Sequence, residues 1–69
     1  MTKKDLRVLA ADMYMAYGNI SKDKKSIEAF FTAIRHLIRS LYDISPRFQK
    51  EKFLELCGFL EEYENWSKG

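Results

Sequence analysis

The chain has 69 residues, of which 46% are apolar and 32% charged, and its net charge at neutral pH is +2. This length allows one domain at most, because domains rarely fall much below about 50 residues. It leaves no room for a cofactor fold with its own crossover units, and the apolar fraction is too high for a disordered chain. We therefore expect a single domain over residues 1–69.

A chain this short has a small core, which needs reinforcement from disulfides, metal, association or packed aromatic side chains. Cys57 is the only cysteine and excludes an internal disulfide. Cys57 and His36 are also the only thiolate and imidazole ligands, too few for a structural zinc site. We therefore expect no metal and no cofactor, and a homodimer becomes one way to complete the core.

The scarcity of Val and Thr favours an all-α fold, and the first helix is predicted over residues 3–17. Thr2 is a good N-cap, with Asp5 at the capping-box position. Gly18 is expected to end the helix in a left-handed conformation. The apolar stripe of this helix consists of Leu6, Leu9, Met13 and Tyr17.

The second predicted helix covers residues 24–43, and its apolar residues recur with helical spacing. The candidates for the N-cap of this helix are Ser21, Asp23 and Ser26. The apolar stripe consists of Ile27, Phe30, Phe31, Ile34, Leu37, Ile38 and Leu41.

A third helix is predicted over residues 46–57, with Ser45 as its cap and Pro46 at its first position. Gly58 then interrupts the apolar pattern. Either one weakened helix continues past it or a separate short helix covers residues 59–66, and the spacing favours the break. The predicted fold is a compact all-α bundle of three helices with this short fourth.

The small net charge is the sum of a basic N-terminal part and an acidic C-terminal part. Residues 1–50 contain ten Lys or Arg against five Asp or Glu, a net charge of +5, whereas residues 51–69 carry a net charge of −3. If the first two helices pack antiparallel, the basic side chains form one face that binds the phosphates of nucleic acid. That face would contain Lys3, Lys4, Arg7, Lys22, Lys24, Lys25, Arg35 and Arg39.

From residue 45 to residue 58 the chain reads Ser-Pro-Arg-Phe-Gln-Lys-Glu-Lys-Phe-Leu-Glu-Leu-Cys-Gly. This segment resembles a signature of small uncharacterised bacteriophage and prophage proteins, Asn-Pro-Arg-Phe-Asp-Arg-Glu-Arg-Phe-Leu-x-x-Cys-Gly. Many members also open with Met-Thr-Lys-Lys-Asp. The chain departs from the signature at Ser45 and Gln49, and its tail from Phe59 onward is longer. The resemblance implies a phage or prophage setting and no particular activity.

The sequence contains no catalytic constellation. Cys57 and His36 could be a nucleophile and its base, but His36 falls on a polar helix face and no third group orients it. No phosphate-binding loop is present, because the three glycines are isolated. We therefore expect a protein that is not an enzyme.

Five aromatic residues fit the three-helix stripes poorly or extend them at the tail, and exposed aromatic side chains are typical of binding surfaces. We therefore expect a protein that binds another protein or itself. The phage or prophage setting that the resemblance implies makes it a small accessory protein, for instance one that inhibits a host regulator or a bacterial defence complex. The alternative is a small nucleic-acid-binding regulator. No segment has the length and hydrophobicity of a membrane span, and we expect the bacterial cytoplasm as its location. The predicted partner-binding residues are Tyr14, Phe48, Phe59, Tyr63 and Trp66.

Overall fold

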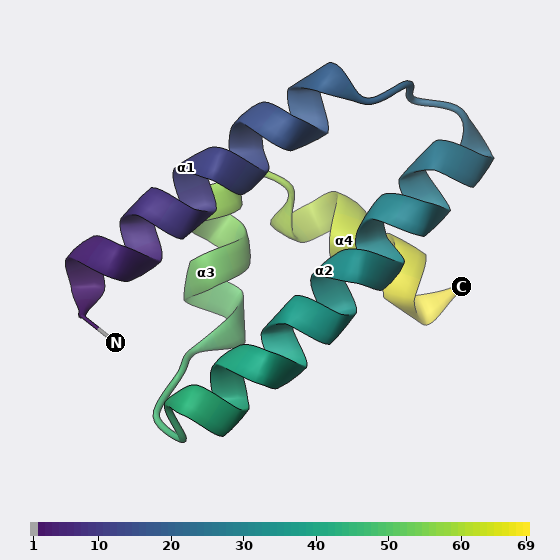
Figure 1. Ribbon diagram of the computed structural model, residues 1–69. Coiled ribbons are helices and arrows are strands. Elements are labelled where there is room, and N and C mark those ends of the chain that lie inside the picture. Colours follow the sequence, from purple (N-terminus) through teal and green to yellow (C-terminus); the bar gives the residue numbers. More distant parts are fainter. Residues whose placement is uncertain (1) are drawn as a thin grey trace.

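Four helices make up the computed structural model, which describes residues 2–69 (Figure 1). α1 spans Lys3–Asn19, α2 spans Lys24–Ile44, α3 spans Lys50–Cys57 and α4 spans Leu60–Lys68. No strand occurs among the described residues, which confirms the predicted all-α fold.

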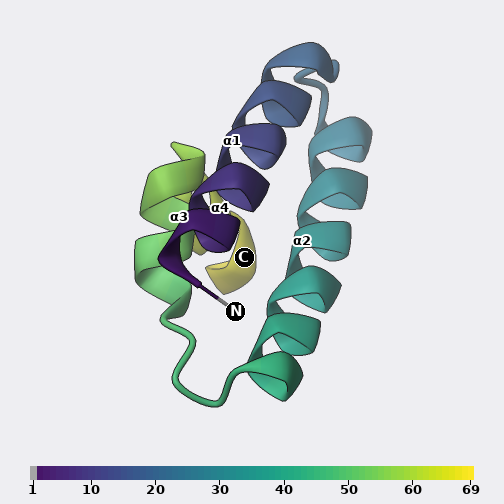
Figure 2. The ribbon, with the colours of Figure 1, turned by 60° about the vertical axis from the view of Figure 1, so that its left-hand side comes forward.

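The two long helices run in opposite directions like two arms joined at one end, and α3 and α4 bridge them (Figures 1 and 2). α3 packs on α1, α4 packs on α2, and α3 and α4 contact each other. α1 meets α2 near the loop that joins them, where Tyr17 lies against Phe30 and Phe31. α3 and α4 thus lie on one side of the two long helices (Figures 1 and 2).

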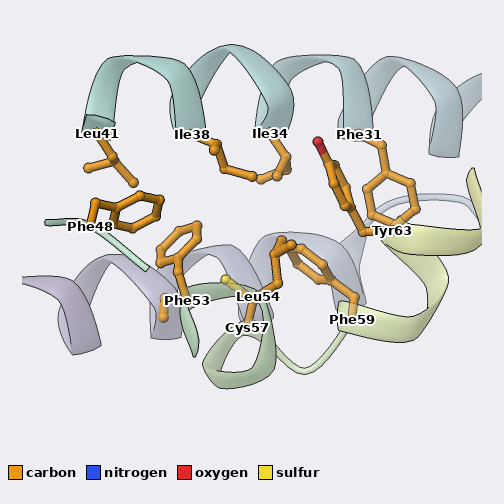
Figure 3. Close-up of a cluster of buried hydrophobic side chains, with 11 residues drawn as sticks. Phe31, Ile34, Ile38, Leu41, Phe48, Phe53, Leu54, Cys57, Phe59 and Tyr63 are labelled. Atoms are coloured by element: carbon orange, nitrogen blue, oxygen red, sulfur yellow. The ribbon is translucent and has the colours of Figure 1, made fainter. Parts of the chain in front are cut away.

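The core draws on all four helices and on the segment before α3 (Figure 3). α2 supplies its predicted stripe, whereas α1 buries only one side chain completely. The buried side chains are Ala10, Phe31, Ile34, Ile38, Leu41, Phe48, Phe53, Leu54, Cys57, Phe59 and Tyr63.

The predicted capping box at the start of α1 is confirmed. The Asp5 backbone N–H donates to Thr2 Oγ1 at 3.2 Å, and the Thr2 N–H donates to Asp5 Oδ2 at 3.4 Å. The end of α1 differs from the prediction, because Gly18 stays helical and α1 continues to Asn19. The Lys22 ammonium donates to the carbonyl oxygens of Tyr17 and Ile20, so these carbonyls are satisfied without a left-handed residue.

Asp23 is the N-cap of α2. Its carboxylate accepts from the Ser26 N–H at 2.8 Å and from the Ser21 hydroxyl at 2.7 Å. These bonds, the Ser26 backbone first, lower the pKa of Asp23 below its ordinary value of 3.8.

Because the pKa of Asp23 is lowered in the folded chain, part of the free energy of unfolding is lost at acid pH. The charged cap stabilises the fold fully above pH 3.8, and this contribution is lost as the pH falls through the lower folded-state pKa. Asp23→Asn keeps an oxygen acceptor but cannot titrate. Between about pH 5 and about pH 2, we expect urea unfolding to show a smaller loss of stability for Asp23→Asn than for the unaltered chain. Equal losses would contradict this role of the carboxylate.

α3 begins at Lys50, four residues after the predicted start at Pro46. Ser45, Pro46, Arg47 and Phe48 form a turn instead, closed by the Phe48 N–H donating to the Ser45 carbonyl at 2.9 Å. Pro suits the second position of such a turn as well as it suits the start of a helix. The turn sends Phe48 into the core, where its ring packs against Tyr42 with centroids 5.0 Å apart.

The predicted break at Gly58 is confirmed. Gly58 has a φ of 80°, the left-handed conformation in which glycine ends helices, and α4 starts at Leu60. The turn folds α4 back against α2. This change of direction decides which aromatic side chains reach solvent.

Candidate binding groove

Most of the predicted partner-binding residues lie in the core, which corrects the expectation that they are exposed. Phe48, Phe59 and Tyr63 are buried and Trp66 is half-buried. Only Tyr14 remains on the surface, with 62% of its side chain exposed. The correction has one main cause, because the turn at Gly58 points α4 inward and makes its aromatic residues part of the fold.

Three of these side chains belong to an aromatic cluster, which consists of Tyr17, Phe30, Phe31, Phe59, Tyr63 and Trp66. Phe59 lies at its centre, with ring centroids 5.1 Å from Tyr17, 5.7 Å from Phe30 and 5.5 Å from Phe31. Tyr63 and Trp66 extend the cluster along α4. Aromatic packing therefore supplies the reinforcement that so short a chain needs.

The residues of the predicted basic face are spread along α1, α2 and the loop between them. The N-terminal end of α1 carries Lys3, Lys4 and Arg7. The loop between α1 and α2 and the start of α2, at the other end of α1, carry Lys22, Lys24 and Lys25 (Figure 1). α1 packs on α3 and α2 packs on α4, whereas α1 and α2 make few contacts with each other.

Two residues of that predicted face serve the fold itself. Lys22 caps the end of α1, and its ammonium lies 4.3 Å from the Tyr17 ring centroid. The Arg35 guanidinium lies 5.7 Å from the Trp66 ring centroid and also partly offsets the rise that burial causes in the pKa of Tyr63. Arg35 thus belongs to the edge of the aromatic cluster.

A groove of about 740 Å³ lies between the start of α1, the turn before α3 and one flank of α3. Four exposed cationic side chains line it: Lys3 and Arg7 from α1, Arg47 from the turn and Lys52 from α3. Glu55 is the only acidic residue in the lining. We call this the basic groove.

The basic groove has an apolar floor. The floor is formed by Leu6, Phe48 and Leu56. Leu56 is 48% exposed, although leucine is usually among the buried residues. A large apolar side chain left open in a charged groove is typical of binding sites, where it contacts the ligand.

Tyr14 lies on the same side of α1 as two residues of the groove. At 3.6 residues per turn, Lys3, Arg7 and Tyr14 fall within about 40° of one another around the helix axis. Tyr14 lies over Gly58, where a Cβ atom would come within 2.9 Å of its ring. The exposed tyrosine and the groove therefore share one side of the molecule.

Sequence reasoning missed half of the groove. Lys3 and Arg7 were predicted to bind nucleic acid, but Arg47 and Lys52 were not assigned to any site. Both lie in the segment that resembles the phage signature, and Thr2 and Lys3 of the opening segment line the same groove. The two stretches that carry the resemblance thus meet at one surface.

Cys57 and His36 do not form a pair. Cys57 is fully buried, whereas His36 is exposed on α2. Burial raises the pKa of the Cys57 thiol to about 12, so at neutral pH it is protonated and a weak nucleophile. Across residues 2–69, no group of three or more His, Cys, Asp or Glu side chains is arranged to hold a metal ion.

The burial of Cys57 predicts that a water-soluble thiol reagent will not react with the folded chain at neutral pH. The same reagent should react fully once the chain is unfolded in urea, which can be followed by mass spectrometry. Fast reaction under native conditions would show that this part of the core opens readily.

No helix of the described chain is both long enough and apolar enough to cross a membrane. Comparison of the chain with protein-family models, with curated proteins and with solved structures found no match.

Proposed function

We propose that this chain is a non-enzymatic accessory protein of phage or prophage origin that binds another protein through the basic groove. The observation that carries the proposal is the combination of an open apolar floor at Leu56 with four cationic side chains around it. The chain would act by blocking a surface of a host or phage protein, because the bound surface is no longer available to other molecules. A host regulator or a bacterial defence complex in the cytoplasm would be a target of suitable size.

The groove favours a protein segment that combines acidic and apolar side chains. Its cations attract carboxylates, and its floor offers Leu56 to an apolar side chain. A nucleic acid fits less well, because Phe48, the one aromatic residue in the lining, is buried and cannot stack on a base. Glu55 would also repel phosphates.

The proposal is tested by capture from host-cell lysate with the tagged chain. We expect the pair Arg47→Glu and Lys52→Glu to lose the captured protein. The matched control is the pair Lys24→Glu and Lys25→Glu, which reverses the same amount of charge beside the loop and should retain it. Equal capture by both pairs would refute a role for the groove.

The alternative, a nucleic-acid-binding regulator, keeps some support from the four cations of the groove. Titration with generic DNA and RNA at low and raised salt separates the two functions. Tight binding that falls steeply with salt and disappears with Arg47→Glu and Lys52→Glu would favour the regulator. We expect no such binding.

A further inference from the structure

An acidic hollow of about 410 Å³ lies next to the basic groove, on the surface around the end of α3 and the start of α4. Glu55, Glu61, Glu62 and Glu64 line it, together with Gly58 and Leu60. Glu55 also lines the basic groove, so the two depressions share a border. Charges of opposite sign therefore lie side by side on one face of the molecule.

Two exposed apolar side chains lie close to this border. Leu56 lines the basic groove, and Tyr14 covers Gly58, which lines the acidic hollow. The face thus combines exposed apolar side chains with a basic region and an acidic region. Protein–protein interfaces have a similar organisation, with apolar side chains in the centre and charges at the rim.

We propose that the basic groove binds a second copy of this chain, and that two copies associate face to face about a two-fold axis near Glu55. A two-fold axis turns a basic region and an adjacent acidic region into two matching contacts. The groove of each copy then faces the acidic hollow of the other, and Tyr14 and Leu56 are covered. The inference rests on the proposed function, since it assigns to the same groove a second copy of the chain, which a foreign partner then displaces when it binds.

A dimer held in this way depends on salt. Its charged contacts lie at the rim, where dissolved ions screen them. We expect sedimentation velocity of the full chain to show dimers near 0.01 M salt, where the screening length is about 30 Å, and mainly monomers near 1 M, where it is about 3 Å.

Two charge-reversed variants test the geometry. Arg47→Glu with Lys52→Glu leaves Lys3 and Arg7 as the cations of the basic groove, and Glu61→Lys with Glu62→Lys leaves Glu55 and Glu64 as the acidic residues of the hollow. At low salt each variant alone should dimerise at least about a hundredfold more weakly, because the altered side chains then face side chains of the same sign. An equimolar mixture should restore a dimer, since both contacts become complementary in the mixed pair. Far-UV circular dichroism verifies that each variant is helical.

Four outcomes would overturn the dimer: a wild-type monomer at low salt, open-ended polymers, dimers that neither reversal weakens, or a mixture that stays monomeric. The pair Lys24→Glu and Lys25→Glu lies outside the face and should dimerise normally. Failure of the proposed function is seen separately, in lysate capture. Glu61→Lys with Glu62→Lys leaves the basic groove intact, so it should still capture a foreign partner even if the wild-type chain never dimerises.

Discussion

Replacing Phe59 with alanine is expected to lower the free energy of unfolding by about 3–5 kcal/mol, the usual cost of removing a buried phenylalanine side chain. The Phe59 side chain is fully buried at the centre of the aromatic cluster, against Tyr17, Phe30 and Phe31. A domain of this size has a total stability of only about 3–10 kcal/mol. Thermal unfolding followed by circular dichroism should therefore find the variant largely unfolded or with a greatly lowered midpoint.

The control is Tyr14→Ala. Tyr14 is 62% exposed, and we expect a change within about 0.5 kcal/mol, as for most surface substitutions. Phe59→Leu should lie between the two, because it keeps part of the buried volume. If Phe59→Ala were as stable as Tyr14→Ala, the aromatic cluster would not hold α4 against the rest of the fold.

The same substitution at two glycines is expected to change stability in opposite directions. Gly58→Ala should destabilise the chain by about 1–2 kcal/mol, since an L-residue resists the left-handed conformation. Its Cβ would also meet the Tyr14 ring at 2.9 Å, although that exposed ring can move. Gly18→Ala should stabilise by about 0.5–1 kcal/mol, because Gly18 is helical and has open space around its Cα.

Urea unfolding of both variants measures the two effects on one scale. Combining Gly58→Ala with Tyr14→Ala removes the side-chain contact and leaves the backbone cost alone. Stabilisation by Gly58→Ala would contradict the left-handed glycine turn between α3 and α4, and destabilisation by Gly18→Ala would contradict the helical conformation of Gly18 near the end of α1.

Much of the secondary structure could be predicted from the sequence because its causes are local. The stripe of α2 continues over about four turns, and Thr2 with Asp5 caps α1 through bonds three residues apart. Gly58 interrupts an apolar pattern, which marks a break. Pro46 was misleading because the same residue starts helices and occupies turns, and the buried contact of Phe48 with Tyr42 decides between them.

The site could be predicted only in part because it depends on how the helices pack. Helical periodicity identifies a face of one helix but not the direction in which the next helix runs. Phe59 and Tyr63 were therefore assigned to the surface, although the turn at Gly58 buries them. Arg47 and Lys52 join Lys3 and Arg7 only because α3 packs on α1 instead of α2.

The most direct test of the basic groove is a map of amide chemical shifts by NMR. The isotope-labelled chain is observed while the unlabelled protein that it captures from lysate is added. We predict that the largest changes fall within residues 2–7 and 45–56, the two segments that contain the lining of the groove, with smaller changes at Tyr14. Changes concentrated instead between Lys22 and Lys25, or around Arg35 and Arg39, would contradict a binding role for the groove.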